Sequence, residues 1–156
     1  MTPSPEDDLF WMTMALSLAE AAAAIDEVPV GAIIVCQGRL ISTGINLRES
    51  TRQASAHAEF LAIEEASRYL NAWRLQDCTL YVTLEPCLMC AGAIYQARIP
   101  RVVYGARDAK GGALGSLYQL NEDARLNHRY TVVEGVRAES SAALLSGFFK
   151  RKRLKV

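Results

Sequence analysis

Four residues in two short segments could together carry out hydrolytic metal chemistry. His57 and Glu59 lie two positions apart, and Cys87 and Cys90 follow later in a Pro-Cys-x-x-Cys segment. One imidazole and two thiolates can occupy three corners of a zinc tetrahedron and leave the fourth to water. Zinc lowers the pKa of bound water from about 15.7 to about 7, so hydroxide becomes available at neutral pH. We therefore predict one Zn²⁺ per subunit, held by His57, Cys87 and Cys90, with Glu59 beside it as the catalytic residue.

The spacing of the two cysteines favours metal binding. Cys87 and Cys90 are three apart, so in the first turn of a helix their sulfurs share one face. Pro86 suits the start of that helix, where its missing N–H is not needed. The positive end of the helix dipole favours thiolates, the form that zinc binds. Two small core residues are the simpler interpretation. A thioredoxin-like redox pair is a further one, but it leaves His57 and Glu59 without a role.

The spacing of His57 and Glu59 places a condition on the local structure. Residues two apart point to nearly opposite faces of a helix, so we expect His57 at the very start of a helix, before regular dihedrals begin. Glu59 then shares a face with Ile63, Ala66 and Leu70, which looks like the buried side. Partial burial should raise the pKa of this carboxyl group towards values useful for proton transfer. A surface glutamate beside a core histidine is the alternative.

The other cysteines and the second histidine fit the zinc site less well. A closed four-thiolate site normally uses two Cys-x-x-Cys pairs, and this sequence has one. Cys36 and Cys78 fall in apolar strands and are predicted to be core residues. His128 stands in a polar stretch and is expected at the surface or in a turn.

Size and charge limit the possible classes. With 156 residues, of which 51% are apolar, the chain 1–156 is predicted to form a single domain with one sizeable core. The acidic N-terminus does not have the pattern of a secretory signal, and no apolar run reaches the roughly 18 residues of a membrane span. We therefore expect a cytoplasmic protein with reduced thiols and no membrane segment.

The net charge of zero argues against a general nucleic-acid binder. The charges are unevenly distributed, however, because acids gather in the first part and bases at the end, at Lys150, Arg151, Lys152, Arg153 and Lys155. Such a cationic tail can still contact phosphates.

Hydrophobic periodicity predicts alternating helices and strands. Helices are expected from Ser4 to about Ile25 and over 57–70, 87–98 and 140–152, strands over 30–36, 39–44, 79–84, 101–105 and 130–134, and loops over 47–55 and 108–116. The strand–helix–strand order over 79–105 requires a parallel pair. The predicted fold class is α/β, a three-layer α/β/α arrangement in which a mixed sheet of about five strands carries helices on both faces.

The His-x-Glu and Pro-Cys-x-x-Cys signature resembles the zinc-dependent cytidine and deoxycytidylate deaminase superfamily. Segments 28–32, 80–87 and 105–110 and the closing run 142–153 look like the bacterial tRNA-specific adenosine deaminases in particular. The similarity runs from about Trp11 to Arg153. One departure is Gln53-Ala54-Ser55-Ala56, where that group often has an Asp-Pro-Thr-Ala-like sequence before the histidine.

The resemblance implies a cytidine deaminase-like fold and hydrolytic conversion of adenosine to inosine at the wobble position of a tRNA anticodon, with Glu59 as the proton shuttle. It implies a homodimer and an anticodon stem-loop as partner. The substrate-binding residues that it implies are Asn46, Ala58, Leu84 and Glu85 around the flipped nucleotide, and Arg107, Asp108, Lys110 and Phe149 along the anticodon loop. An ordinary turn residue is an equal interpretation of Asn46, and solvated charges or a core aromatic are alternatives for the last four.

Two other functions are compatible with the sequence. One is a zinc-dependent deaminase of a free base, nucleoside or nucleotide of the cytosine, deoxycytidylate or guanine type. The other is a zinc-stabilised RNA-binding module without activity.

Overall fold

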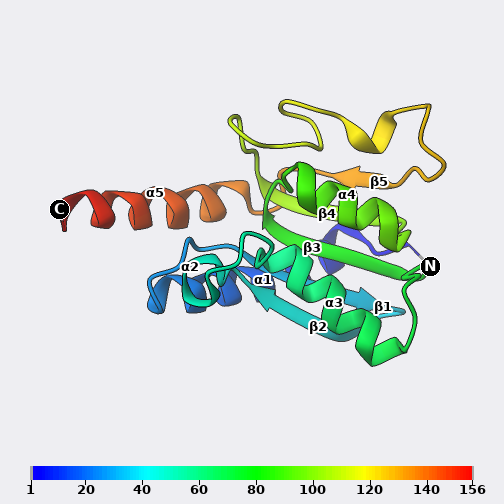
Figure 1. Ribbon diagram of the computed structural model, residues 1–156, viewed down its shortest axis with the longest axis horizontal. Coiled ribbons are helices and arrows are strands. Elements are labelled where there is room, and N and C mark those ends of the chain that lie inside the picture. Colours follow the sequence, from blue (N-terminus) through cyan, green and yellow to red (C-terminus); the bar gives the residue numbers. More distant parts are fainter. Residues whose placement is uncertain (1, 156) are drawn as a thin grey trace.

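A mixed β-sheet forms the middle layer of the computed structural model, which describes residues 2–155 (Figure 1). In this part of the chain the sheet has five strands in the order β2-β1-β3-β4-β5. Their bounds are β1 Gly31–Cys36, β2 Arg39–Ile45, β3 Cys78–Leu84, β4 Arg101–Ala106 and β5 Thr131–Val133. β1 is antiparallel to β2 and β3, whereas β4 is parallel to β3 and β5. The predicted mixed sheet and the parallel pair over 79–105 are therefore confirmed.

Helices cover both faces of this sheet (Figure 1). Helices α1 (Pro5–Ala24) and α5 (Ala138–Leu154) lie on one face, and α3 (Ala58–Leu70) and α4 (Leu88–Ala97) on the other. Each face has its own cluster of buried apolar side chains. Because six of the seven residues of β3 are buried, this central strand contributes to both clusters. The predicted three-layer arrangement is confirmed.

Helix α1 begins as the sequence predicts. Ser4 Oγ accepts a hydrogen bond from Asp7 N at 3.1 Å, and the Asp7 carboxylate accepts one from Ser4 N at 2.8 Å. This reciprocal capping box satisfies two amides that have no partner within the helix. One turn later, buried Asp8 accepts two hydrogen bonds from Arg101, at 2.8 and 2.7 Å, and one from Tyr81 Oη at 2.7 Å. These contacts fix α1 to β3 and β4.

A short helix, α2 (Arg48–Thr51), stands where a loop was predicted. Its first three amides find acceptors outside the helix: Arg48 N donates to Asn46 Oδ1, and Glu49 N and Ser50 N donate to the carboxylate of Glu27. A four-residue helix is stable here because these distant and local acceptors replace the missing intrahelical ones. The 3₁₀ turn η1 (Leu120–Glu122) lies between β4 and β5.

Helix α5 leaves the sheet and its C-terminal part extends beyond it (Figure 1). Phe148 is buried, and Lys152 Nζ lies 2.6 Å from the Asp26 carboxylate just after α1. The predicted helix over 140–152 is confirmed, and its observed range, Ala138–Leu154, is longer. None of the described helices combines the length and apolar character that crossing a bilayer requires.

Candidate metal centre and active site

The N-termini of α3 and α4 lie side by side at the end of the sheet where β3 finishes (Figure 1). His57 is the N-cap of α3, with extended φ −83° and ψ 150°, and Cys87 is the N-cap of α4, with φ −78° and ψ 178°. Cys90 follows in the first turn of α4. The expectation that His57 precedes regular helical dihedrals is confirmed, and this conformation turns its imidazole towards the two sulfurs.

Close packing on β2 fixes the start of α3. A Cβ on Gly44 would overlap the carbonyl oxygen of Ala58, so the first turn of α3 can lie against the strand only because residue 44 is a glycine. Ser42 Oγ also donates a hydrogen bond to the Ala62 carbonyl at 2.8 Å. These contacts fix the position of the first turns of α3, and so of its N-cap His57, relative to β2.

The three predicted ligands come together. The ligand atoms of His57, Cys87 and Cys90 all lie within 4.8 Å of one another. His57 Nδ1 is 3.6 Å from Cys87 Sγ and 3.5 Å from Cys90 Sγ. A tetrahedral zinc with bonds of about 2.0 Å to nitrogen and about 2.3 Å to sulfur separates those atoms by about 3.5 Å. The donor set and its spacing therefore fit Zn²⁺, with Nδ1 as the nitrogen ligand.

The cluster also favours an anionic sulfur. Hydrogen bonding from the Cys90 thiol and from His57 lowers the pKa of Cys87 to about 4 against the effect of burial. The same hydrogen bond, together with burial, raises the pKa of Cys90. Both cysteines lie at the N-terminus of α4, Cys87 as its N-cap and Cys90 in its first turn, where the helix dipole stabilises negative charge. A cation bound at this site would therefore replace the protons that these sulfurs and the imidazole carry without metal.

Glu59 lies in the first turn of α3 and is buried, with 4% of its surface exposed. Burial raises the pKa of Glu59 to about 7, as expected from the sequence, while its own backbone amide and His57 act in the opposite direction. Ile63 and Ala66 share its buried side as predicted, whereas Leu70, at the helix end, is 37% exposed. A carboxyl group that titrates near neutrality beside a hydrolytic metal can both accept and donate a proton.

Asn46 is buried, and both ends of its side chain have protein partners. Its Oδ1 accepts a hydrogen bond from Arg48 N at 3.1 Å, and its Nδ2 donates to the Val28 carbonyl at 3.4 Å. This is the geometry of a turn residue that initiates α2. Oδ1 has a second lone pair that could accept a hydrogen bond from a nucleotide. The contact of Asn46 to a nucleotide therefore stays a prediction.

Glu85 anchors the loop that follows β4. Its buried carboxylate accepts hydrogen bonds from Asp108 N at 3.0 Å, Leu114 N at 3.1 Å, Ser116 N at 3.0 Å and Ser116 Oγ. These bonds outweigh the effect of burial and hold the pKa of Glu85 below its usual value. Pro86 O also accepts from Ala113 N, so the loop over 107–118 is attached to the segment that presents Cys87. The family resemblance implies a substrate contact for Glu85, and nothing in the sequence predicted this anchoring role.

The remaining predicted contact residues differ in their exposure. Arg107 is exposed and paired with Glu134 at 3.0 Å, and Asp108 Oδ1 accepts from the amides of Lys110 and Gly111. Ala58 is buried at the start of α3, Leu84 is partly buried at the end of β3, and Phe149 on α5 is 44% exposed. Arg107, Lys110 and Phe149 are thus exposed at the surface, whereas Asp108 is partly buried.

Glu27 is a site-framing residue that the sequence did not reveal. It is 1% exposed and accepts hydrogen bonds from Ser50 N at 2.6 Å, Ser50 Oγ at 2.5 Å and Glu49 N at 3.2 Å. Burial raises the pKa of Glu27, but these bonds outweigh that effect and lower it. The carboxylate thereby fixes the segment that leads into His57. In the sequence it follows Asp26 and is one of the acids of the first part of the chain, and no local pattern marks it as buried.

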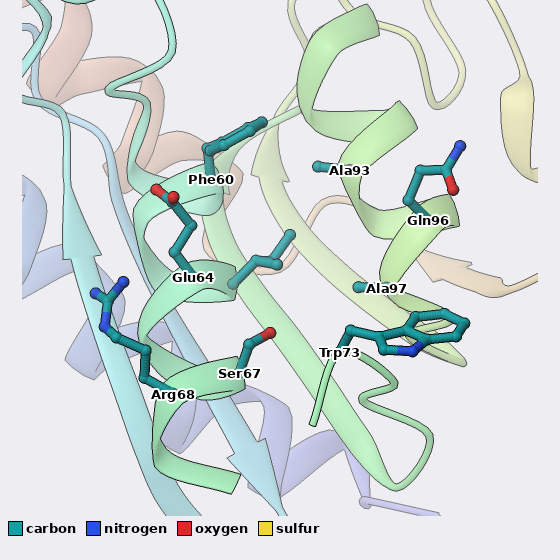
Figure 2. A pocket seen from close by; sticks show the side chains of 9 residues that line it. Phe60, Glu64, Ser67, Arg68, Trp73, Ala93, Gln96 and Ala97 are labelled. Atoms are coloured by element: carbon teal, nitrogen blue, oxygen red, sulfur yellow. The ribbon is translucent and has the colours of Figure 1, made fainter. Parts of the chain in front are cut away.

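A groove of about 820 Å³ runs along the outer side of α3 and α4. Figure 2 shows Phe60 on α3 and Ala93 and Ala97 on α4 pointing towards the space between the helices, with Trp73 at one end. Phe60 belongs to the first turn of α3, so this end of the groove lies at the end of the helix that carries His57. Trp73 is 59% exposed.

Comparison with known proteins gives consistent matches over nearly the whole chain. Residues 6–153 match the family model of the MafB19-like deaminases. A tRNA-specific adenosine deaminase of Bacillus subtilis (strain 168) is 47% identical over 150 residues, which cover 96% of this chain and 92% of that protein. A solved structure from a study of A-to-I editing by tRNA:A34 deaminases at the wobble position is 42% identical, with a TM-score of 0.83, over 86% of this chain and 97% of that one. A guanine deaminase from Nitrosomonas europaea is 25% identical, with a TM-score of 0.78, over 95% of this chain and 86% of that one.

Proposed function

This chain belongs to the MafB19-like deaminase family, within its tRNA-specific adenosine deaminases, and we propose on that premise that it converts adenosine to inosine at the wobble position of a tRNA anticodon. The observation that carries the proposal is the convergence of His57, Cys87 and Cys90 around a space of zinc dimensions, with buried Glu59 beside it. A tRNA substrate would place the enzyme in the cytoplasm.

The cofactor we propose is one Zn²⁺ per subunit, held by His57 Nδ1 and the sulfurs of Cys87 and Cys90. When bound, zinc lowers the pKa of water so that hydroxide is available at neutral pH. Glu59 takes the proton from that water and delivers it to the ring nitrogen N1 next to the reacting carbon C6. Glu59 then takes the remaining proton of the added water and passes it to the amine as the C6–N6 bond breaks, so adenosine and water give inosine and ammonia. Its burial supports this role because a desolvated carboxyl group changes protonation near neutral pH.

The substrate must enter as an unstacked nucleotide, because C6 of a stacked adenine cannot reach a buried carboxyl group. Asn46, Ala58, Leu84 and Glu85 are our candidates for its walls, and the loop residues Arg107, Asp108 and Lys110 and the aromatic Phe149 for contacts to the rest of the anticodon loop. What supports them is position: the Glu85 anchor attaches the loop directly beside Cys87. Single-stranded loops are where RNA bases can be splayed out and read.

We further propose that two copies associate through the groove between α3 and α4. An apolar groove with an exposed tryptophan suits burial against a second protein surface. Glu64 and Arg68 lie one helical turn apart in the lining of the groove. In a two-fold dimer, Glu64 of each copy could therefore face Arg68 of the other copy. Because the groove starts at Phe60, a second copy would lie next to the metal centre and could complete the site.

The proposal is tested with the zinc-loaded protein, an anticodon stem-loop RNA and free nucleosides and bases. Inosine formed from the stem-loop supports it, and turnover of free guanine, cytosine or deoxycytidylate in its place would refute it. Guanine is the specific rival because of the likeness to a guanine deaminase. The variant Glu59→Ala should lose almost all turnover while zinc content and fold are retained. Activity that survives in this variant would refute the proton-shuttle assignment.

A further inference from the structure

Cys36 and Cys78 face each other across the β1–β3 ladder. They are the last antiparallel pair of that ladder, in direct register. Residues in direct register point to the same side of a sheet, and both side chains pack in the apolar cluster beneath α3 and α4. Cys78 is 1% exposed, whereas Cys36 is partly exposed, and both are free thiols.

The hydrogen bonds around this pair identify its type. In an antiparallel sheet, opposed residues alternate between a hydrogen-bonded and a non-hydrogen-bonded arrangement. Cys78 N donates to the Leu75 carbonyl at 3.2 Å, so this amide is engaged outside the ladder. The pair is therefore of the non-hydrogen-bonded type, in which opposed Cα atoms are about 4.5 Å apart and side chains approach most closely. Disulfides span Cα separations of about 4.4–6.8 Å, so this pair can close with little backbone movement.

From this register and the shared burial we propose that Cys36 and Cys78 are a redox pair that forms a reversible cross-strand disulfide when a small disulfide such as oxidised glutathione is the oxidant. Cys36, the more accessible thiol, loses its proton and attacks one glutathione sulfur, and the second glutathione leaves as a thiolate. Cys78 then loses its proton and attacks Cys36 Sγ, which releases the first glutathione. Two protein thiols are oxidised, one glutathione disulfide is reduced to two thiols, and the two protons pass to the glutathione thiolates.

The order of attack follows from the surroundings of the two thiols. Burial, together with the neighbouring Cys36, raises the pKa of Cys78 to about 12, so Cys78 is a poor first nucleophile towards a molecule in solution. It becomes effective once the mixed disulfide on Cys36 lies beside it. We therefore expect Cys36 to react first with the oxidant and Cys78 to resolve the mixed disulfide.

The pair lies away from the metal centre. Cys78 begins β3, and the ligand Cys87 follows the other end of this strand. Seven residues at about 3.3 Å each place the two ends about 20 Å apart. The bond would close the chain from β1 through His57 and α3 to β3, a loop of about 40 residues, and so restrict mainly the unfolded state. We expect higher stability with catalysis unchanged.

The experiment treats the zinc-loaded protein, in which the metal protects Cys87 and Cys90, with oxidised glutathione, followed by mass spectrometry of unreduced peptides. The expected result is a peptide pair joined through Cys36 and Cys78, and a rise in Tm of roughly 10 °C that dithiothreitol reverses. Absence of this pair under conditions that oxidise an unfolded control, or a pairing of Cys36 with Cys87 or Cys90, would overturn the proposal.

Two single variants test the order of attack. Cys78→Ala should accumulate one glutathione on Cys36, whereas Cys36→Ala should accumulate none on Cys78. Alanine is small and apolar at both positions, and Cys78→Ser serves as a second variant if Cys78→Ala fails to fold. A glutathione adduct on Cys78 in preference to Cys36 would refute the mechanism.

Discussion

Gly112 provides a sharp test of how the loop over 107–118 is held. A Cβ on this residue would lie less than 3.0 Å from Cδ and both carboxylate oxygens of Glu85. Glu85 cannot turn away without breaking its hydrogen bonds to Asp108, Leu114 and Ser116. Hydrogen bonds to a charged group contribute about 1.5–3 kcal/mol each. If Gly112→Ala breaks two of them, the free energy of unfolding should fall by about 3–6 kcal/mol.

The neighbouring Gly111 is the matched control. Its added Cβ would meet Asp108 Oδ2 at 3.4 Å, an ordinary contact, so Gly111→Ala should change stability by less than about 1 kcal/mol. Urea unfolding of both zinc-loaded variants measures the difference, and hydrogen exchange of the amides over 108–116 shows whether the loop has opened locally. If the two variants unfold within about 0.5 kcal/mol of each other, the steric reasoning about Glu85 is wrong.

Other contacts make equally specific predictions. Because Glu27 has a lowered pKa in the folded protein, its stabilising effect is present above its ordinary pKa of 4.5 and is lost as the pH falls through the folded value. The difference in unfolding free energy between wild type and Glu27→Gln should therefore shrink between about pH 7 and about pH 3, and a constant difference would contradict this. Arg101→Met leaves the Asp8 carboxylate without its buried cation and should destabilise the protein by about 3–5 kcal/mol in denaturant unfolding, much of which the double variant with Asp8→Leu should restore. Neutralising residues 150–151 should raise KM for the stem-loop and reduce the salt slope of binding by about one unit per residue with zinc content unchanged. Lys152→Gln, which breaks the contact with Asp26, should change the slope less, and equal slopes would refute the distinction.

Local patterns in the sequence were sufficient to predict most of the fold. Ser4 and Asp7 form the predicted start of α1, and Gln37-Gly38 turns the hairpin with φ of 51° and 77°. The short helix α2 was not predictable, since its first turn depends on a carboxylate more than twenty residues earlier in the chain. The polar composition of its own residues favours a loop.

The grouping of the three candidate metal ligands was predictable because residue type and spacing both restrict a zinc site. Cys87 and Cys90 had to share a helical face, and His57 had to precede its helix, and both conditions are met. The partners of Glu85 lie 23–31 residues later, at positions with no regular spacing. A carboxylate that gathers scattered loop amides leaves no periodic trace, so only the structure reveals it.

Three buried glutamates hold or flank the segments that form the candidate centre, and both their hydrogen-bond donors and their depth of burial separate their roles. Glu27 and Glu85 each accept several hydrogen bonds from loop amides and hydroxyls, which stabilise the anion and lower the pKa. Glu59 receives no hydrogen bond from a loop amide among residues 2–155, and its deep burial raises its pKa to about 7. A permanent anion is suited to hold a loop in one position, whereas a carboxyl group that gains and loses a proton is suited to transfer one. Substituting Glu27 or Glu85 by glutamine should therefore act mainly on stability and KM for the stem-loop, and Glu59→Gln mainly on kcat. A dominant loss of kcat in the first two variants with KM unchanged would contradict this division of roles.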